Sequence, residues 1–259
     1  MKPSIVFLMY HELKLQGRRL CQSSPGYVRY VLSVSDFRTQ LQMLRAGAWQ
    51  GLSVGEAIEF PPPRSVAITF DDGCETDLLA AAPGLLEMGM GGTFYITTGF
   101  LGQRGYLSRT QLQELSNLGF EIGCHSRTHP YLPALDQAGL HREIVETKQC
   151  LEEVIGKPVE HFSCPGGRYD RRVIEFVRSA GYRTLATSRA KANGPSSDPY
   201  LLGRVAVLRG IDPFEFQEFC SGKRLWSLHL QDTFRNSARA ILGNSFYDSI
   251  RESVLGNAS

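Results

Sequence analysis

The chain has 259 residues, of which 42% are hydrophobic and 21% charged; 28 basic residues nearly balance 26 acidic ones, so the formal net charge is +2. This length allows one large domain or two small ones. The small net charge argues against a nucleic-acid-binding protein, which needs a concentrated basic face. No apolar run approaches the roughly 20 residues of a membrane span, so no transmembrane segment is expected.

The first apolar stretch, residues 4–10, has the length of a signal-sequence core. It lacks a small-residue cleavage site and continues directly into His11, so we interpret it as a first strand and expect a cytoplasmic protein.

The six cysteines include no Cys-x-x-Cys pair. In a reducing compartment they are expected to be free thiols.

Short apolar or β-branched segments alternate along the chain with segments that carry apolar residues at helical spacing. Ser35 and Ser108 are expected to cap two of the helices, and Gly119, Gly156 and Gly181 to follow three helix ends. Residues 15–30 are expected to form a long loop. The predicted strands are residues 5–10, 66–70, 93–97, 120–125, 161–164 and 184–187, and the predicted helices are residues 36–46, 78–88, 110–118, 140–155 and 171–180.

This alternation predicts an α/β fold with a mainly parallel sheet, and six or seven such units favour a closed or nearly closed barrel over an open sheet. We expect residues 1–222 to form the barrel and residues 223–259 to form a C-terminal helical extension packed on or beside it. Apolar residues recur about every four positions from Trp226 onward, with Lys and Arg beside them. Weak contact with a membrane surface is an alternative role for this helix.

Two adjacent carboxylates, Asp71 and Asp72, directly follow a predicted strand and precede Gly73. At the carboxyl-terminal mouth of a barrel such positions carry catalytic groups. Adjacent carboxylates repel each other, so both stay ionised only near a positive charge such as a metal ion. The alternative interpretation is an ordinary turn or a helix N-cap.

His125 and His129 follow another predicted strand, and Pro130 favours a turn rather than a helix at His129. With Asp72 they supply three protein ligands and leave a position for water, as in catalytic zinc sites. Surface or core histidines explain many such pairs.

Gly166 and Gly167 follow a third strand. Their backbone N–H groups could approach a ligand, as an oxyanion hole requires. The alternative interpretation is an ordinary glycine-rich turn.

Taken in chain order, residues 69–73, 125–129 and 165–167 resemble the motifs of the polysaccharide deacetylases of carbohydrate esterase family 4, the NodB-type domain. The resemblance covers roughly residues 4–210. It implies a distorted (β/α) barrel of about seven strands in which Asp71 is the general base. It further implies that Asp72, His125 and His129 hold one divalent metal, with Zn²⁺ expected and Mn²⁺, Co²⁺ or Ni²⁺ as alternatives. The backbone amide of Gly166 is implied to help form the oxyanion hole.

The implied function is a metal-dependent hydrolase that removes N-acetyl groups from the amino sugars of a polysaccharide or its precursor and releases acetate. The expected partner is therefore an N-acetylated glycan; the sequence carries no signal for an oligomeric state. Met9-Tyr10-His11 also resembles the branch that acts on exopolysaccharides such as poly-N-acetylglucosamine, which implies that His11 is the general acid. His229 is the competing general acid, because Leu228-His229-Leu230 resembles the C-terminal strand of other members.

Two positions depart from the family pattern: Ser163 stands where the motif arginine is usual, and Gly166 replaces an aromatic residue. Arg168 and Arg204 are candidate replacements for that arginine. Its absence also supports an alternative function, a catalytically silent metal- and glycan-binding barrel. A non-haem iron oxygenase shares the ligand set, but these enzymes commonly have an all-β scaffold, and oxygen activation gives Asp71 no role.

Overall fold

A parallel sheet forms the centre of the computed structural model, which describes residues 4–59 and 61–225. Seven strands follow the path β10-β1-β5-β6-β7-β8-β9, and β4 pairs with β5 beside this path. A two-stranded parallel ladder of β2 and β3 lies apart from it. The strands are β1 (Val6–Tyr10), β2 (Leu13–Lys14), β3 (Leu32–Ser33), β4 (Gln50–Leu52), β5 (Ser65–Phe70), β6 (Thr93–Ile96), β7 (Glu121–Cys124), β8 (His161–Ser163), β9 (Thr184–Ala186) and β10 (Val205–Ala206).

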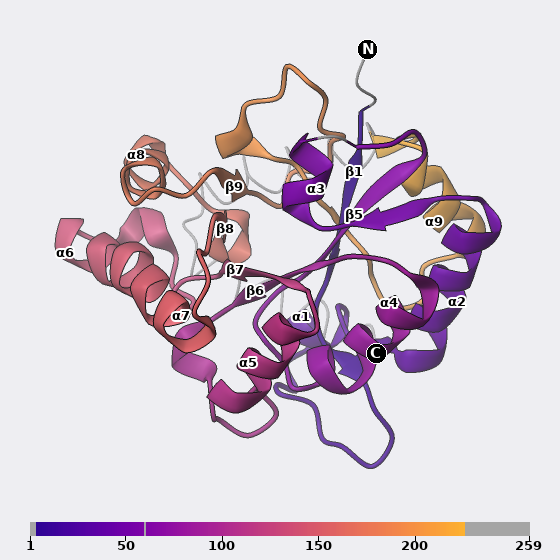
Figure 1. Cartoon of the computed structure of the whole chain (residues 1–259), viewed down its shortest axis with the longest axis horizontal. Coiled ribbons are helices and arrows are strands. Elements are labelled where there is room, and N and C mark those ends of the chain that lie inside the picture. The colour runs from indigo at the N-terminus through magenta and orange to yellow at the C-terminus, as the bar shows by residue number, and fades with distance from the viewer. Residues whose placement is uncertain (1–3, 60, 226–259) are drawn as a thin grey trace.

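Helices surround this sheet: α6, α7 and α8 lie on one flank in Figure 1, and α2, α4 and α9 on the other. The α-helices are α1 (Pro25–Val28), α2 (Val34–Ala46), α3 (Val54–Glu59), α4 (Ala82–Met88), α5 (Arg109–Asn117), α6 (Gln137–Leu140), α7 (Thr147–Ile155), α8 (Arg171–Ser179) and α9 (Pro213–Cys220). The π-helical turns are η1 (Asp77–Ala81) and η4 (His141–Glu146), and the 3₁₀ turns are η2 (Thr98–Phe100), η3 (Leu132–Ala134), η5 (Pro165–Gly167) and η6 (Pro199–Leu201).

The predicted distorted barrel is confirmed, in an open form. The path ends at β9 on one side and β10 on the other. The segment before β10 bridges the gap, because Thr187 N–H donates to the Leu202 carbonyl (2.8 Å) and Leu202 N–H donates to the Leu185 carbonyl (3.0 Å). The barrel is therefore joined across its seam by hydrogen bonds from one connecting segment.

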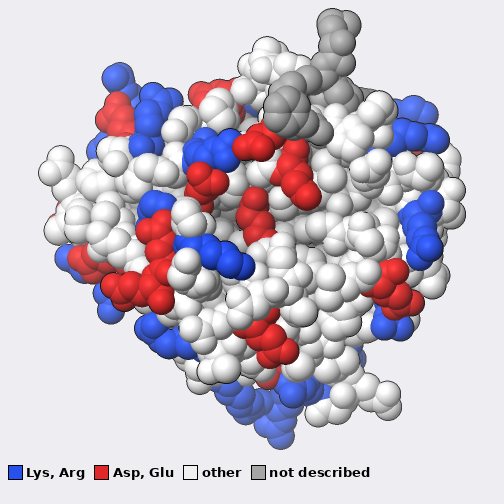
Figure 2. Space-filling view, viewed as in Figure 1, with Lys and Arg blue, Asp and Glu red and all other residues white. Residues whose placement is uncertain are grey.

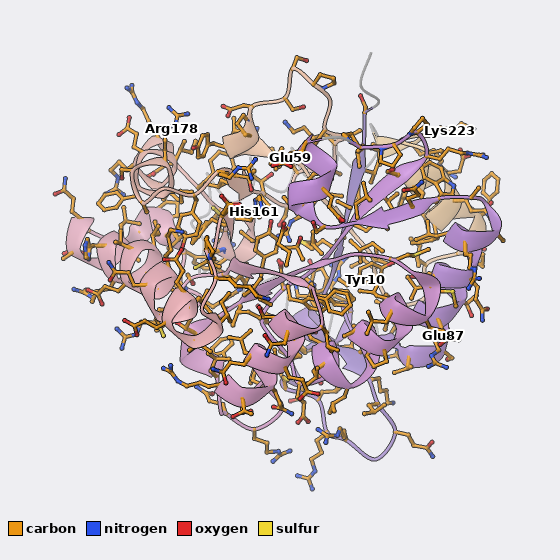
Figure 3. All side chains as sticks on the ribbon, viewed as in Figure 1. Tyr10, Glu59, Glu87, His161, Arg178 and Lys223 are labelled. Carbon is orange, nitrogen blue, oxygen red and sulfur yellow. The ribbon has the colours of Figure 1, made fainter. Side chains whose placement is uncertain are left out.

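The central strands β1 and β5 are buried at every position. Helices on the outside and side chains on the inside exclude water from both faces, which is why these strands are continuous apolar runs. Aromatic rings stack across the strands: the centroid of Phe70 lies 5.2 Å from that of Tyr10 and 5.0 Å from that of Phe94. Tyr10, labelled in the interior in Figure 3, satisfies its hydroxyl by donating to Gln40 Oε1 (2.9 Å).

Helix ends follow local capping chemistry, with one correction. Ser108 caps α5 through a reciprocal capping box with Gln111, as predicted. The cap of α2 is Ser33 and not Ser35, because Ser33 Oγ accepts a hydrogen bond from Asp36 N–H (3.0 Å). The two side-chain oxygens lie 2.8 Å apart. The sequence could not select between them, because either serine can cap a helix. The three glycines expected after helices all have positive φ: Gly119 (94°), Gly156 (67°) and Gly181 (79°).

Three further differences concern short elements. The predicted loop at residues 15–30 contains α1. The predicted helix at residues 140–155 starts at the last residue of α6 and continues through the π-turn η4 into α7. The predicted helix at residues 78–88 likewise begins as η1 and continues as α4. The sequence reasoning missed β2, β3, β4, α3, β10 and α9, which are only two to eight residues long and carry little periodicity.

The predicted C-terminal helix and His229 lie outside the described residues. Within residues 4–59 and 61–225, no helix has both the length and the apolar character needed to cross a membrane. On the face drawn in Figure 2, Lys and Arg are interspersed with Asp and Glu, as expected from the nearly balanced charge.

A half-buried carboxylate lies at the end of the sheet where β7 begins. Glu121 accepts hydrogen bonds from Thr93 Oγ1 (2.5 Å) and Gly55 N–H (3.0 Å), and it pairs with His161 Nε2 (3.3 Å). Burial would raise the pKa of Glu121, but the hydrogen bond and charge of His161 outweigh burial and leave the pKa below its usual value.

The pKa of Glu121 is lower in the folded state than in the unfolded state, where it is about 4.3. Ionised Glu121 therefore stabilises the folded protein fully above this unfolded-state pKa, and the stabilisation is lost as the pH falls through the folded-state pKa. Glu121→Gln should lower the free energy of unfolding by about 1–3 kcal/mol at neutral pH. The difference from wild type should shrink in acid. Urea unfolding at a series of pH values measures it, with Glu114→Gln on exposed α5 as the control. A difference that does not change with pH would contradict this assignment.

Candidate active site

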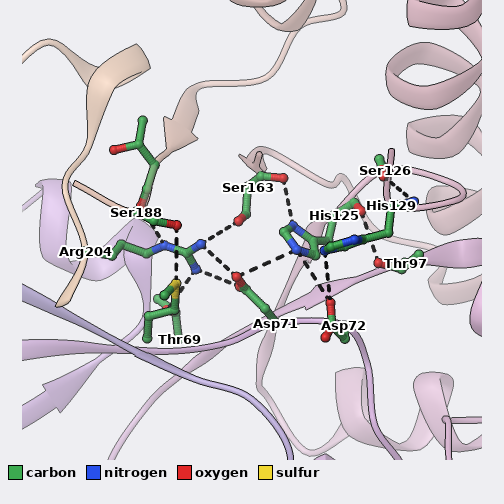
Figure 4. Close-up of polar contacts among 12 residues, drawn as sticks. Thr69, Asp71, Asp72, Thr97, His125, Ser126, His129, Ser163, Ser188 and Arg204 are labelled. Atoms are coloured by element: carbon green, nitrogen blue, oxygen red, sulfur yellow. Dashed lines mark hydrogen bonds and ion pairs between the residues drawn. The ribbon is translucent and has the colours of Figure 1, made fainter. Parts of the chain in front are cut away.

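The three sequence motifs meet where parallel strands end. Asp71 and Asp72 directly follow β5, His125 follows β7, and Ser163 is the last residue of β8. Carboxyl ends of parallel strands lie at one edge of a sheet, which is where α/β proteins place their ligand and catalytic groups. Figure 4 shows these side chains converging at that edge.

The structure brings together the three predicted metal ligands. The ligand atoms of Asp72, His125 and His129 all lie within 4.8 Å of one another. Asp72 Oδ1 is 3.6 Å from Nε2 of His125 and 3.6 Å from Nε2 of His129. Asp72 and His125 are buried, whereas the His129 side chain is 35% exposed, so the cluster is open on the His129 side.

The backbone around these ligands adopts left-handed conformations. Asp72 has a φ of 81°, Ser126 of 64° and His129 of 58°. Non-glycine residues in this region are strained, and such residues gather at functional sites. The side chain of Ser126 supports the turn by accepting a hydrogen bond from His129 N–H (3.1 Å), so the turn predicted from Pro130 is confirmed.

The chemistry of this cluster fits a divalent metal. Asp72 Oδ1 is buried and has no hydrogen-bond partner among the described residues. His125 Nδ1 lies 2.8 Å from the Ser163 carbonyl, which can only accept, so Nδ1 carries the proton and the Nε2 lone pair faces Asp72. Burial lowers the pKa of His125 to about 4, which keeps the imidazole neutral, as metal ligation requires.

Asp71 is held by a fully buried arginine. Arg204 donates from Nη1 to Asp71 Oδ1 and from Nη2 to Asp71 Oδ2, both at 2.7 Å. Burial would raise the pKa of Asp71, but the charge of Arg204, then the charge of His125 and the Arg204 hydrogen bonds, hold it well below its usual range. Asp71 is therefore a carboxylate in a fixed orientation, which is the state that a general base needs.

Arg204 thus takes the place of the motif arginine, and Ser163 is part of the replacement. Arg204 Nη2 also donates to Ser163 Oγ (2.7 Å), while Nε donates to the Thr187 carbonyl (3.1 Å). Arg168, the other candidate, stacks over the ring of Tyr131 at 3.6 Å from its centroid. Sequence reasoning could not choose between them, because Arg204 lies 133 residues beyond Asp71.

The glycine turn after β8 has a left-handed backbone, and at Gly167 it leaves no room for a side chain. Gly166 and Gly167 have φ values of 59° and 67°, and a Cβ on Gly167 would lie 2.5 Å from Ser188 Oγ. Within the turn, the amides of Gly167 and Arg168 donate to the carbonyls of Cys164 and Pro165. This pairing makes the Gly166 amide the candidate oxyanion donor, as the sequence implied.

His11 follows β1, the neighbour of β5, and is half-buried. Its ring packs on Tyr30 with the centroids 4.6 Å apart, and its Nδ1 is buried without a hydrogen-bond partner in the part of the chain that is described. Burial lowers the pKa of His11, whereas the charges of Asp72 and Asp71 oppose this shift. The structure therefore brings His11 into the electrostatic field of the two aspartates.

Comparisons with known proteins match this chain to polysaccharide deacetylases. Residues 59–185 match the family model described as polysaccharide deacetylase. A candidate polysaccharide deacetylase of Bacillus subtilis, YxkH, is 26% identical over 222 residues, covering 83% of this chain and 76% of the relative. The poly-beta-1,6-N-acetyl-D-glucosamine N-deacetylase of Staphylococcus aureus is 24% identical over 212 residues, covering 74% and 72%.

Solved structures share the fold. The deacetylase PplD of Streptococcus pyogenes aligns with a TM-score of 0.75 at 20% identity, over 85% of this chain and 99% of that one. IcaB from Ammonifex degensii aligns with a TM-score of 0.71 at 25% identity, over 84% and 96%. A barrel with two aspartates after β5 and a histidine pair after β7 has the arrangement of a NodB-type domain. Residues 59–185 of this chain form a polysaccharide deacetylase domain of carbohydrate esterase family 4.

If Arg204 orients the base, Arg204→Lys should lower kcat by about 10–100-fold, part of the roughly 10²–10⁴-fold that a general base contributes. Lysine keeps the charge but cannot donate the two parallel hydrogen bonds. Acetate-release kinetics measure the loss, and metal content should not change. Arg178→Lys, on α8 away from the site, is the control. Unaltered kcat in a folded Arg204→Lys protein would remove the assigned role.

Proposed function

We propose that this protein is a metal-dependent hydrolase that removes N-acetyl groups from the amino sugars of a polysaccharide or its precursor and releases acetate. The proposal rests on the different contacts that two adjacent aspartates make. Asp72 faces two imidazole nitrogens, whereas both oxygens of Asp71 are held by Arg204. One carboxylate is thereby a metal ligand and the other is free to accept a proton.

In this proposal Asp72, His125 and His129 hold the ion. A bound divalent metal lowers the pKa of water and polarises the acetyl carbonyl. Asp71 accepts the proton of the attacking water, and Arg204 keeps its carboxylate aimed and ionised. The Gly166 amide donates to the oxygen on which negative charge develops. His11 gives a proton to the departing sugar amine, and the charges of Asp72 and Asp71 favour the protonated ring that this step needs.

The proposed substrate class is a glycan containing N-acetylglucosamine, which rests on the named activity of the Staphylococcus aureus relative. Zn²⁺ is the proposed metal, since two imidazoles and one carboxylate with a position for water are a common catalytic zinc set. The cytoplasmic location expected from the sequence stays a prediction. It would make a polysaccharide precursor the substrate, because a finished wall polymer lies outside the cell.

The alternative of a catalytically silent barrel loses its main support. That alternative depended on the missing motif arginine at Ser163. Arg204 provides two hydrogen bonds to Asp71 from another segment, and Ser163 accepts a third from the same guanidinium. The base therefore keeps the orientation that a turnover-competent site requires.

The direct test is acetate release from N-acetylglucosamine oligomers by the purified chain loaded with Zn²⁺. Asp71→Asn should keep its metal and lose about 10²–10⁴-fold in kcat, because the amide cannot accept the water's proton. A chelator should abolish release in the wild type and restored Zn²⁺ should recover it. Metal analysis and an acetate assay measure both effects.

The matched control is Asp36→Asn, an exposed carboxylate in the first turn of α2. Bound Zn²⁺ with no acetate from any N-acetylated sugar would favour the silent barrel. A chain that binds no metal would reject the ligand assignment itself.

The role of His11 has its own test. His11→Asn should lower kcat by about 10²–10⁴-fold while Zn²⁺ content stays the same, because a neutral amide cannot protonate the leaving amine. An aryl N-acetyl substrate whose amine leaves without protonation should restore most of the rate. His229→Asn should behave as wild type. The reverse pattern, with His229→Asn inactive and His11→Asn active, would assign the acid to His229.

A further inference from the structure

A second group of metal-ligating atoms lies beside the catalytic cluster. One ligand atom from each of Glu12, Cys21 and Cys74 lies within 4.8 Å of the other two. They come from separate parts of the chain: Glu12 after β1, Cys21 in the long loop before α1, and Cys74 after β5. Glu12 and Cys74 are buried, and Cys21 is half-buried.

The two sulfur atoms have the spacing of ligands on one ion. Cys21 Sγ lies 3.5 Å from Cys74 Sγ. Thiolates at about 2.3 Å from one tetrahedral Zn²⁺ are separated by about 3.8 Å. Two sulfurs and one carboxylate oxygen also differ from the catalytic set, which holds two imidazoles and one carboxylate. The second group therefore suits a thiophilic ion.

The surrounding hydrogen bonds orient these ligands. Glu12 Oε2 accepts from Cys21 N–H (3.0 Å) and from the Tyr27 hydroxyl (3.0 Å), which fixes the carboxylate beside the sulfurs. The Cys21 thiol has one proton for two acceptors, Cys74 Sγ and the Gly105 carbonyl at 3.1 Å. Orienting contacts of this kind are typical around metal ligands.

A nearby carboxylate adds an independent observation. Asp77, the first residue of η1, is 1% exposed, and both of its side-chain oxygens lack a hydrogen-bond partner among the described residues. Burial raises the pKa of Asp77 well above its usual range, and the charges of Cys21, Asp72 and Glu12 raise it further. Without a cation nearby this carboxyl is therefore protonated, and a bound cation would favour its ionised form.

We propose that Glu12, Cys21 and Cys74 bind a second divalent ion of the Zn²⁺ class, beside the buried carboxyl of Asp77. Binding releases the two thiol protons to solvent and leaves both cysteines as thiolates. The ion ties the long loop through Cys21 to the segment that follows Asp72. It thereby supports the strained backbone of the catalytic cluster without taking part in hydrolysis.

The test is loading of the reduced full chain with Co²⁺. Thiolate ligands should produce a near-ultraviolet sulfur-to-cobalt charge-transfer band, which the catalytic imidazoles and carboxylate cannot produce. Cys21→Ser should lose this band and bind about one Zn²⁺ fewer per chain than the wild type. Cys150→Ser, which alters a half-buried thiol on α7, should retain both.

His129→Gln distinguishes the catalytic ligand group from the proposed second site. This variant should keep the charge-transfer band and lose acetate release, so each proposed site is tested independently of the other. Protection of the wild-type thiols from alkylation by Zn²⁺ gives a second measure that does not depend on Cys21→Ser folding. No band in the reduced wild type, a band that persists in Cys21→Ser, or a Cys21–Cys74 disulfide that forms in the presence of Zn²⁺ would each overturn the proposal.

Discussion

The buried pair of Arg204 and Asp71 is the interaction on which the site depends. Taking two charges out of water costs several kcal/mol for each ion, and only good geometry with further hydrogen bonds offsets that cost. Here the guanidinium makes two parallel bonds to the carboxylate and is also satisfied by Ser163 and by the Thr187 carbonyl. Removal of either partner would leave an unpaired buried charge.

This pair also explains how an open barrel maintains a precise site. Arg204 immediately precedes β10, Asp71 follows β5, Ser163 ends β8 and Thr187 follows β9. One guanidinium therefore joins four segments around the mouth, where ladder hydrogen bonds do not close the sheet. Asp71 positioned in this way stays aligned with the candidate ligand group that follows β5 and β7.

The two ends of the sheet differ in how completely their polar groups are paired. At the amino-terminal end of β7, Glu121 has donors from Thr93, Gly55 and His161. At the opposite end, Asp72 Oδ1 and His11 Nδ1 are buried without hydrogen-bond partners among the described residues, and Asp72 and His129 have strained backbones. Folding alone favours satisfied groups and relaxed backbones, so this asymmetry marks the end that serves a ligand and not stability.

The sequence by itself determined the alternating strands and helices, because their apolar periodicity is local. It also predicted that Asp72, His125 and His129 meet beside Asp71, because each motif directly follows a strand. It did not determine the cap of α2, where Ser33 and Ser35 are chemically equivalent, or the shortest strands, whose two or three residues carry no periodicity. Only the tertiary structure decided that Arg204 replaces the motif arginine and that Cys21 reaches Cys74. These partners lie 133 and 53 residues apart, and a contact across such separations is set by the packing of the whole sheet.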